Sequence, residues 1–293
     1  MRGHAGGRLQ QRSWFQWKIN GSNQPEWLPD KALPRSRTDR DRIGHMTPVP
    51  AGHPIPTQPS GYDTIADGYT AENETGLLHA YYNRPAILEL AGDVAGRRIL
   101  DVGCGSGPLF AALRDRGATL TGIDSSARML EHARRRLGGE ANLLRADLAD
   151  PLPFPDAAFD DVVASLVLHY LQDWAPPLAE LRRVLASGGR LLVSVEHPFA
   201  NFLAQRLAGD TTDYFQTRNR IDEWTMGGQT ARLSFWDRPL HAMTDAFTAA
   251  GFRISVISEP PALPAARDLI PEVLGESIDN RFLCFLFFVL HAN

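Results

Sequence analysis

An apolar segment that runs directly into a glycine-rich turn constrains the fold of this chain more than any other feature. Residues 97–102 read as a β-strand, and glycines follow at alternate positions, Gly103, Gly105 and Gly107. Because glycine lacks a Cβ, such a turn lets the backbone reverse sharply and approach a ligand closely. Asp124 follows 21 residues after Gly103, at the end of a second apolar segment, where its carboxylate can accept hydrogen bonds from ribose hydroxyls. The turn and the acid together predict a nucleoside-binding site.

The spacing of the glycines separates two ligand classes. A dinucleotide fingerprint reads G-x-G-x-x-G, and its third glycine would fall at residue 108, which is Pro108. Here the pattern is G-x-G-x-G and ends at Gly107. Taken alone, the turn leaves NAD and S-adenosylmethionine equally open, so residues further along the chain must decide between them.

Strand-like and helix-like segments alternate after the turn. Residues 118–124, 142–148 and 159–165 read as strands that end in polar residues. Residues 127–137 carry apolar side chains at helical spacing, and residues 181–193 read as a helix, a glycine stop and a fifth strand. This alternation predicts an α/β fold with a largely parallel sheet, whose ligand lies at the carboxyl ends of the strands.

These segments together closely resemble the class I S-adenosylmethionine-dependent methyltransferases, in particular the small-molecule branch typified by the ubiquinone/menaquinone C-methyltransferases (methyltransferase type 11). The resemblance covers about residues 62–258. It implies a Rossmann-like, seven-stranded, mostly parallel sheet with an antiparallel last strand and helices on both faces. It also implies transfer of a methyl group from S-adenosyl-L-methionine to a small-molecule acceptor, with the acceptor atom (O, N or C) left open.

The resemblance also assigns cofactor contacts. Asp101, Gly103 and Gly105 are expected to hold the methionine end, Asp124 the ribose and Asp147 the adenine amino group. The remaining expected contacts are Tyr69, Ser125, Met129, Leu148 and Ser165. Two vicinal hydroxyls suit a carboxylate acceptor, and a cofactor without a pyrophosphate requires no basic clamp. Other roles stay open, because an aspartate such as Asp147 can cap a following helix, and Met129 and Leu148 can belong to the core.

Two histidines at predicted strand tips are candidates for a general base. His169 follows the fourth strand and His197 follows the fifth. Histidine has a pKa suited to accepting a proton near neutral pH. A structural, hydrogen-bonded role is the alternative for each ring. Weaker candidates are Glu196, Tyr214, Arg238 and His241.

Composition and charge argue against several classes of partner. The chain has 43% apolar residues but no apolar run long enough to span a bilayer, so no membrane is expected. Residues 1–45 carry a net charge of +5 and the rest of the chain −9, and an acidic body matches a phosphate backbone poorly. Two cysteines 180 positions apart form neither a metal motif nor a disulfide framework. We therefore expect a cytoplasmic monomer or homodimer that uses no metal and binds no nucleic acid.

The chain divides into two parts on this interpretation. Residues 1–61 are expected to form a disordered, basic and proline-rich extension, and residues 62–293 the catalytic domain. Within that domain, residues 197–238 are rich in aromatic residues and are expected to form a lid or substrate pocket. Two alternative functions stay open, an NAD(P)-dependent oxidoreductase and a non-catalytic protein that binds S-adenosylmethionine.

Overall fold

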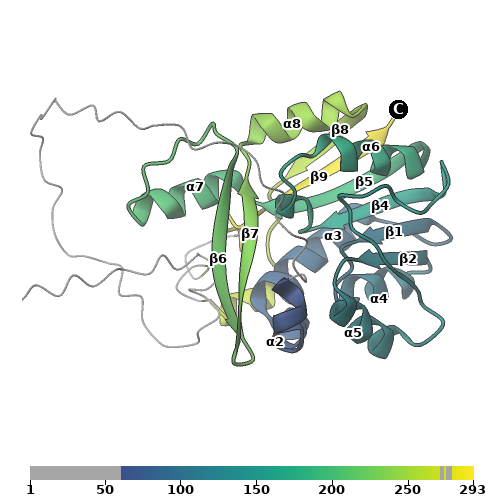
Figure 1. The fold of residues 1–293 in the computed structure, drawn as a ribbon, viewed down its shortest axis with the longest axis horizontal. Coiled ribbons are helices and arrows are strands. Elements are labelled where there is room, and N and C mark those ends of the chain that lie inside the picture. The colour runs from purple at the N-terminus through teal and green to yellow at the C-terminus, as the bar shows by residue number, and fades with distance from the viewer. Residues whose placement is uncertain (1–60, 271–273, 275–278) are drawn as a thin grey trace, which may run out of the picture.

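One seven-stranded sheet organises the protein (Figure 1). The computed structural model describes residues 61–270, 274 and 279–293, so the predicted extension lies outside the described residues except for Gly61. The strands are β1 (Arg98–Val102), β2 (Thr119–Asp124), β3 (Asn142–Arg145), β4 (Phe159–Ser165), β5 (Leu185–Glu196), β8 (Phe252–Ser258) and β9 (Phe285–Ala292). Their order is β3-β2-β1-β4-β5-β9-β8, with β9 antiparallel to both neighbours and the pairs from β3 to β5 parallel. The predicted fold class and its antiparallel last strand are confirmed.

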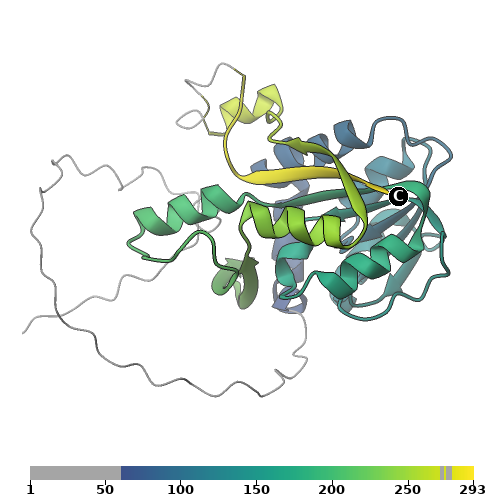
Figure 2. The same ribbon diagram turned by 90° about the horizontal axis from the view of Figure 1, so that it is seen from above.

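Helices cover both faces of this sheet. The helices of the described residues are α2 (Gly61–Thr75), the π-helix η1 (Leu77–Asn83), α3 (Arg84–Ala91), α4 (Pro108–Arg114), α5 (Ala127–Leu137), the 3-10 helix η2 (Leu168–Tyr170), α6 (Ala175–Val184), α7 (Pro198–Leu207), α8 (Leu240–Ala249) and the 3-10 helix η3 (Pro264–Asp268). Figure 2 shows α6 and α8, in green, on one side of the sheet and α3, in blue, on the other. The strands are buried on both sides, since Leu100 packs in one core cluster and its neighbour Ile99 in the other.

The sequence predicts the last strand at residues 281–290, but the strand runs from Phe285 to Ala292. It begins there because its neighbour β5 ends at Glu196, the residue that pairs with Phe285. Apolar residues at helical spacing predict a helix from Leu77 to Leu90 with a kink or boundary at Pro85. The structure has that boundary: the π-helix η1 ends at Asn83, and Pro85 lies in the first turn of α3, where its missing N–H leaves no helical bond unmade.

The segment after β5 forms a separate subdomain. It contains α7 and a long hairpin of β6 (Arg218–Met226) and β7 (Gln229–Asp237), which Figure 1 shows between α7 and α2, beyond the ends of the main strands. Side chains from both hairpin strands form a third core cluster with Ile65 of α2. The hairpin and α2 touch through backbone, because a Cβ on Gly68 would lie 2.5 Å from the Met226 carbonyl carbon. In the described part of the chain, every helix is too short or too polar to cross a membrane.

Candidate active site

A cavity of about 530 Å³ lies at the carboxyl ends of β1, β2 and β4. Its volume is in the range of small-molecule sites. All ten predicted cofactor contacts line it: Tyr69, Asp101, Gly103, Gly105, Asp124, Ser125, Met129, Asp147, Leu148 and Ser165. The structure therefore brings together residues that span almost 100 positions of sequence.

The glycine turn needs a glycine at each of its three positions. The φ angles are 70°, 55° and 80° at Gly103, Gly105 and Gly107, a region that disfavours other residues. A Cβ on Gly103 would lie 2.8 Å from Val167, and one on Gly107 would lie 2.9 Å from Leu137. Around Gly105 the space is open within 4 Å, so this glycine leaves room for a ligand.

Asp124, at the end of β2, is held by the backbone around it. Its Oδ2 accepts the Gly105 N–H at 2.8 Å and its Oδ1 accepts the Ser126 N–H at 2.8 Å. Burial raises the pKa of Asp124, and these two hydrogen bonds oppose that shift. Each carboxylate oxygen can accept a further hydrogen bond, so the side chain is oriented yet able to bind hydroxyls.

Asp101 is the most deeply buried acid that lines the cavity. It is 1% exposed, and within the described part of the chain its Oδ2 has no hydrogen-bond partner. Burial and the nearby Asp124 raise its pKa to about 7. An unpaired buried carboxylate oxygen is unfavourable unless a donor meets it, so this position fits a cationic group such as the ammonium of the cofactor's methionine end.

The residues expected around the adenine also line the cavity. Asp147 accepts the Ala149 N–H at 2.9 Å in a turn, and no helix follows it, so the helix-cap alternative is wrong. Met129 and Leu148 are 2% and 6% exposed. Both therefore pack in the core and present an edge to the cavity.

Other cavity residues escaped the sequence prediction, among them three polar residues close together in the chain. His79, Asn83 and Arg84 come from η1 and the start of α3. The Asn83 amide donates to Ser165 Oγ at 2.8 Å, while its Oδ1, like Asp101 Oδ2, has no partner within the described residues. Burial lowers the pKa of His79 to about 4, so its ring is neutral at pH 7. Polar side chains inside a largely apolar helical segment were the sequence signal that could have identified them.

Tyrosines form the wall of the cavity opposite the sheet. The Tyr62 and Tyr170 hydroxyls lie 2.5 Å apart and join α2 to η2. The Tyr62 and Tyr69 rings meet edge to face with centroids 4.9 Å apart. Burial raises the pKa of Tyr69 to about 12, so its hydroxyl keeps its proton at neutral pH. This wall is aromatic but carries hydrogen-bonding groups.

The two predicted catalytic histidines lie outside the cavity lining. His197 begins α7, where its Nδ1 accepts the Ala200 N–H at 3.3 Å and its Nε2 lies 2.7 Å from Glu259. His169 packs against Tyr170, and burial lowers its pKa to about 3. His197 therefore has the hydrogen-bonded surroundings of the structural alternative, whereas the buried Nδ1 of His169 has no hydrogen-bond partner within the described residues. The weaker candidates Glu196, Tyr214, Arg238 and His241 are also absent from this lining.

Comparison with known proteins agrees with this geometry. A family model described as a methyltransferase domain matches residues 100–193. The demethylmenaquinone methyltransferase of Tropheryma whipplei (strain Twist) is 31% identical over 179 residues, which cover 56% of this chain and 75% of the relative. The malonyl-[acyl-carrier protein] O-methyltransferase of Serratia marcescens is 38% identical over 108 residues, covering 37% of this chain and 42% of the relative.

A solved structure extends the likeness to the fold. The S-adenosylmethionine-dependent methyltransferase from Mesorhizobium loti is 26% identical, covers 71% of this chain and 96% of its own, and has a TM-score of 0.53. None of these matches supports an oxidoreductase. The glycine turn, the strand-tip acids and the match across three quarters of a methyltransferase relative lead to one assignment: the chain belongs to the class I S-adenosylmethionine-dependent methyltransferases.

Proposed function

We propose that this protein binds S-adenosyl-L-methionine along the tips of β3, β2 and β1 and transfers its methyl group to a small molecule in the same cavity. The observation that carries this proposal is the set of acids on those neighbouring strands, Asp147, Asp124 and Asp101. Because adjacent strands lie about 4.8 Å apart, the three positions span roughly 10 Å, a reach suited to adenine, ribose and methionine in that order. The other predicted contacts are proposed to complete the cofactor site: Tyr69, Gly103, Gly105, Ser125, Met129, Leu148 and Ser165.

The methionine end is proposed to lie between β1 and η1. The unpaired Asp101 Oδ2 and Asn83 Oδ1 would accept hydrogen bonds from its ammonium group. Arg84 lines the same region and offers a cation for its carboxylate, with Tyr69 beside it. This arrangement offers an acidic partner to the ammonium group of the methionine end and a basic partner to its carboxylate.

The cofactor supplies a methyl group on a sulfonium, which is already activated for transfer. The protein then contributes mainly alignment, which is worth several kcal/mol in a reaction between two bound partners. In the sheet, β4 lies next to β1, on the side away from β2. We therefore place the acceptor at the carboxyl end of β4, near Ser165, Val167 and Tyr170. Where the acceptor atom must lose a proton, we assign that proton to His79 rather than to His169 or His197, since among the described histidines His79 alone lines the cavity.

The acceptor is proposed to be a small molecule with an apolar or planar body. The wall around its position comes from Tyr62, Tyr170, Leu166 and Leu233. The names of these relatives point to demethylmenaquinone and to malonyl-[acyl-carrier protein] as acceptors, so membership of the family leaves open whether an O, N or C atom is methylated. We propose that residues 197–238 form part of the cover of this site. We also propose that the protein is a cytoplasmic monomer or homodimer without a nucleic-acid or membrane partner.

Calorimetry tests the cofactor, and a transfer assay tests the reaction. We expect S-adenosylmethionine and S-adenosylhomocysteine to bind at one site per chain and NADH to give no heat of binding. Binding of NADH alone would overturn the proposal. A screen of small metabolites with methyl-labelled cofactor should then identify an acceptor; cofactor binding without transfer to any compound would favour the non-catalytic alternative.

A further inference from the structure

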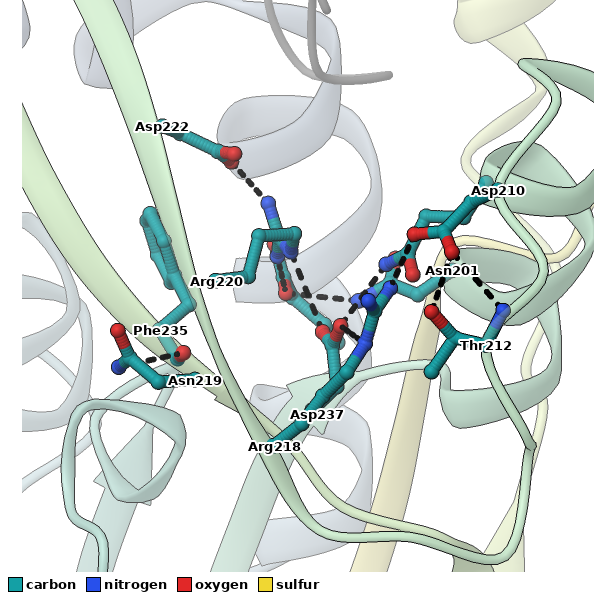
Figure 3. Close-up of polar contacts among 11 residues, drawn as sticks. Asn201, Asp210, Thr212, Arg218, Asn219, Arg220, Asp222, Phe235 and Asp237 are labelled. Carbon is teal, nitrogen blue, oxygen red and sulfur yellow. Dashed lines mark hydrogen bonds and ion pairs between the residues drawn. The ribbon is translucent and has the colours of Figure 1, made fainter. Parts of the chain in front are cut away.

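A buried cluster of ion pairs fastens the β6–β7 hairpin to the main sheet (Figure 3). At its centre is Arg220 of β6, whose side chain is 16% exposed. Its guanidinium donates to Glu196 Oε2 at 2.6 Å, to Asp237 Oδ1 at 3.2 Å and to Asp222. Glu196 is the last residue of β5, so this one side chain joins both hairpin strands to the sheet.

Buried charges such as those of this cluster are not explained by a gain in stability alone. Burial opposes the charge of Arg220, but the carboxylates of Glu196, Asp237 and Asp222 outweigh burial and raise its pKa. Burial also raises the pKa of Asp222. Because removing charges from water offsets most of their mutual attraction, buried ion pairs contribute little net stability compared with apolar packing. Their strict geometry, by contrast, can fix the position of one element relative to another.

Arg220 also contacts the aromatic side chains that lead to the cavity. Its guanidinium carbon lies 4.9 Å from the centroid of the Phe235 ring. The Phe235 ring lies 5.2 Å from that of Tyr170, which lines the cavity and shares its hydroxyl contact with Tyr62 of α2. A continuous series of contacts therefore runs from the end of β5 through the hairpin to the wall around the ligand.

We infer that Arg220 is a positioning residue for ligand binding: bound to Glu196 and lying over Phe235, it holds the hairpin against Tyr170 and keeps the cavity closed around the cofactor. This inference rests on the proposed function. Lysine cannot replace the arginine fully, because an ammonium group lacks the planar fork that binds several carboxylates at once and lies flat on a ring.

Arg218 provides a matched control. It is two residues before Arg220 on the same strand and belongs to the same cluster (Figure 3). Its partners are Asp210 at 2.9 Å and Asp237 at 3.5 Å, which belong to the loop before the hairpin and to the hairpin itself. Changing Arg218 therefore perturbs the same charge cluster without breaking the contact to the main sheet.

The test measures how fast radiolabelled S-adenosylhomocysteine leaves the full-length protein, by rapid filtration after dilution. Arg220→Lys should release it about tenfold faster than the unchanged protein, and Arg218→Lys within twofold of the unchanged rate. Melting temperatures are measured alongside, because a purely structural role would lower stability in both variants without this difference in release. Equal release rates in Arg220→Lys and the unchanged protein, or equal acceleration in both variants, would overturn the inference.

Phe235→Leu is a second, independent variant. It keeps every charge of the cluster but removes the ring that Arg220 and Tyr170 both contact, so it too should accelerate release. It decides the outcome if Arg220→Lys does not fold, and an unchanged rate would count against the inference. Failure of the unchanged protein to bind S-adenosylhomocysteine would contradict the proposed function first, and this inference with it.

Discussion

The two halves of the cavity are held in place in different ways. In the sheet half, formed by the ends of β1, β2 and β3 and the turns after them, the main chain fixes the ligand-facing groups; Asp124, for example, is held by two backbone N–H groups. In the cover half, formed by α2, η1, η2 and the hairpin, side chains from distant elements hold one another, as Tyr62 holds Tyr170. The sheet half is therefore set by local sequence and the cover half by long-range packing.

This difference predicts two kinds of mutational effect. Changes at the acids of the sheet half should weaken ligand binding while the fold is retained, because each acid is positioned by backbone that the change leaves in place. Changes in the cover half should lower stability, since its third core cluster depends on contacts between elements far apart in sequence.

The largest expected effect comes from the charge of Asp101. Its pKa of about 7 means that protonation removes the charge as the pH falls below neutrality. If the ionised form binds the ammonium group of S-adenosylhomocysteine, affinity should fall by up to about tenfold per pH unit below 7, or roughly a hundredfold at pH 5. Calorimetry from pH 5 to pH 8 measures this directly, and equal affinities at the two ends would contradict the assignment.

The raised pKa of Asp101 predicts the opposite pH dependence for the stability of the unliganded protein. Its pKa in the folded protein is raised from the ordinary 3.8, so the folded state binds more protons than the unfolded state between about pH 4 and 7. Stability of the unliganded protein should therefore fall as the pH rises through that window. Asp101→Asn should flatten both pH profiles, with weaker binding at pH 8 and a melting temperature no longer lowered there.

Removal of the Asp124 carboxylate should have the next largest effect. Asp124→Ala is expected to weaken binding of S-adenosylhomocysteine by roughly 1.5–3 kcal/mol, as for lost hydrogen bonds to a charged acceptor. The matched control is Asp93→Ala. Asp93 accepts a backbone N–H two residues ahead, as Asp124 does, but precedes β1 at the opposite end of the sheet. Affinity unchanged in Asp124→Ala, or lowered equally in both, would remove Asp124 from the site.

The comparison also explains how far the sequence could lead. The glycine turn and the acids at strand tips are encoded within a few residues of each strand, so the positions of Asp101, Asp124 and Asp147 are predictable from local pattern alone. The position of His79 depends on how the π-helix η1 packs against α2, where its ring lies 5.7 Å from that of Tyr69, and no local pattern predicts this packing. His197 was misleading for the same reason, since it follows β5 as expected but is used to begin α7.

The next largest effect is expected at the close backbone contact between α2 and the hairpin. A Cβ on Gly68 would lie 2.5 Å from the Met226 carbonyl carbon and 2.6 Å from the Gly227 nitrogen, both of them backbone atoms that cannot rotate away. Gly68→Ala should therefore separate α2 from the hairpin and destabilise the protein by about 2 kcal/mol, the usual range for overpacking. Thermal unfolding of Gly139→Ala, where a Cβ meets open space, is the control. Equal melting temperatures in the two variants would show that the cover tolerates this separation.

The smallest effect is expected for the hydroxyl contact that joins α2 to η2. Tyr62→Phe keeps the ring contact with Tyr69 and removes the hydroxyl that bonds to Tyr170, which should lower the free energy of unfolding by about 1 kcal/mol. Tyr170→Phe should cost a similar amount, and the double variant little more than either single change, because both remove the same interaction. Urea unfolding of the four proteins measures this coupling. Fully additive losses would mean that the two hydroxyls act independently, and that the side chains of the cover half do not hold one another across the cavity.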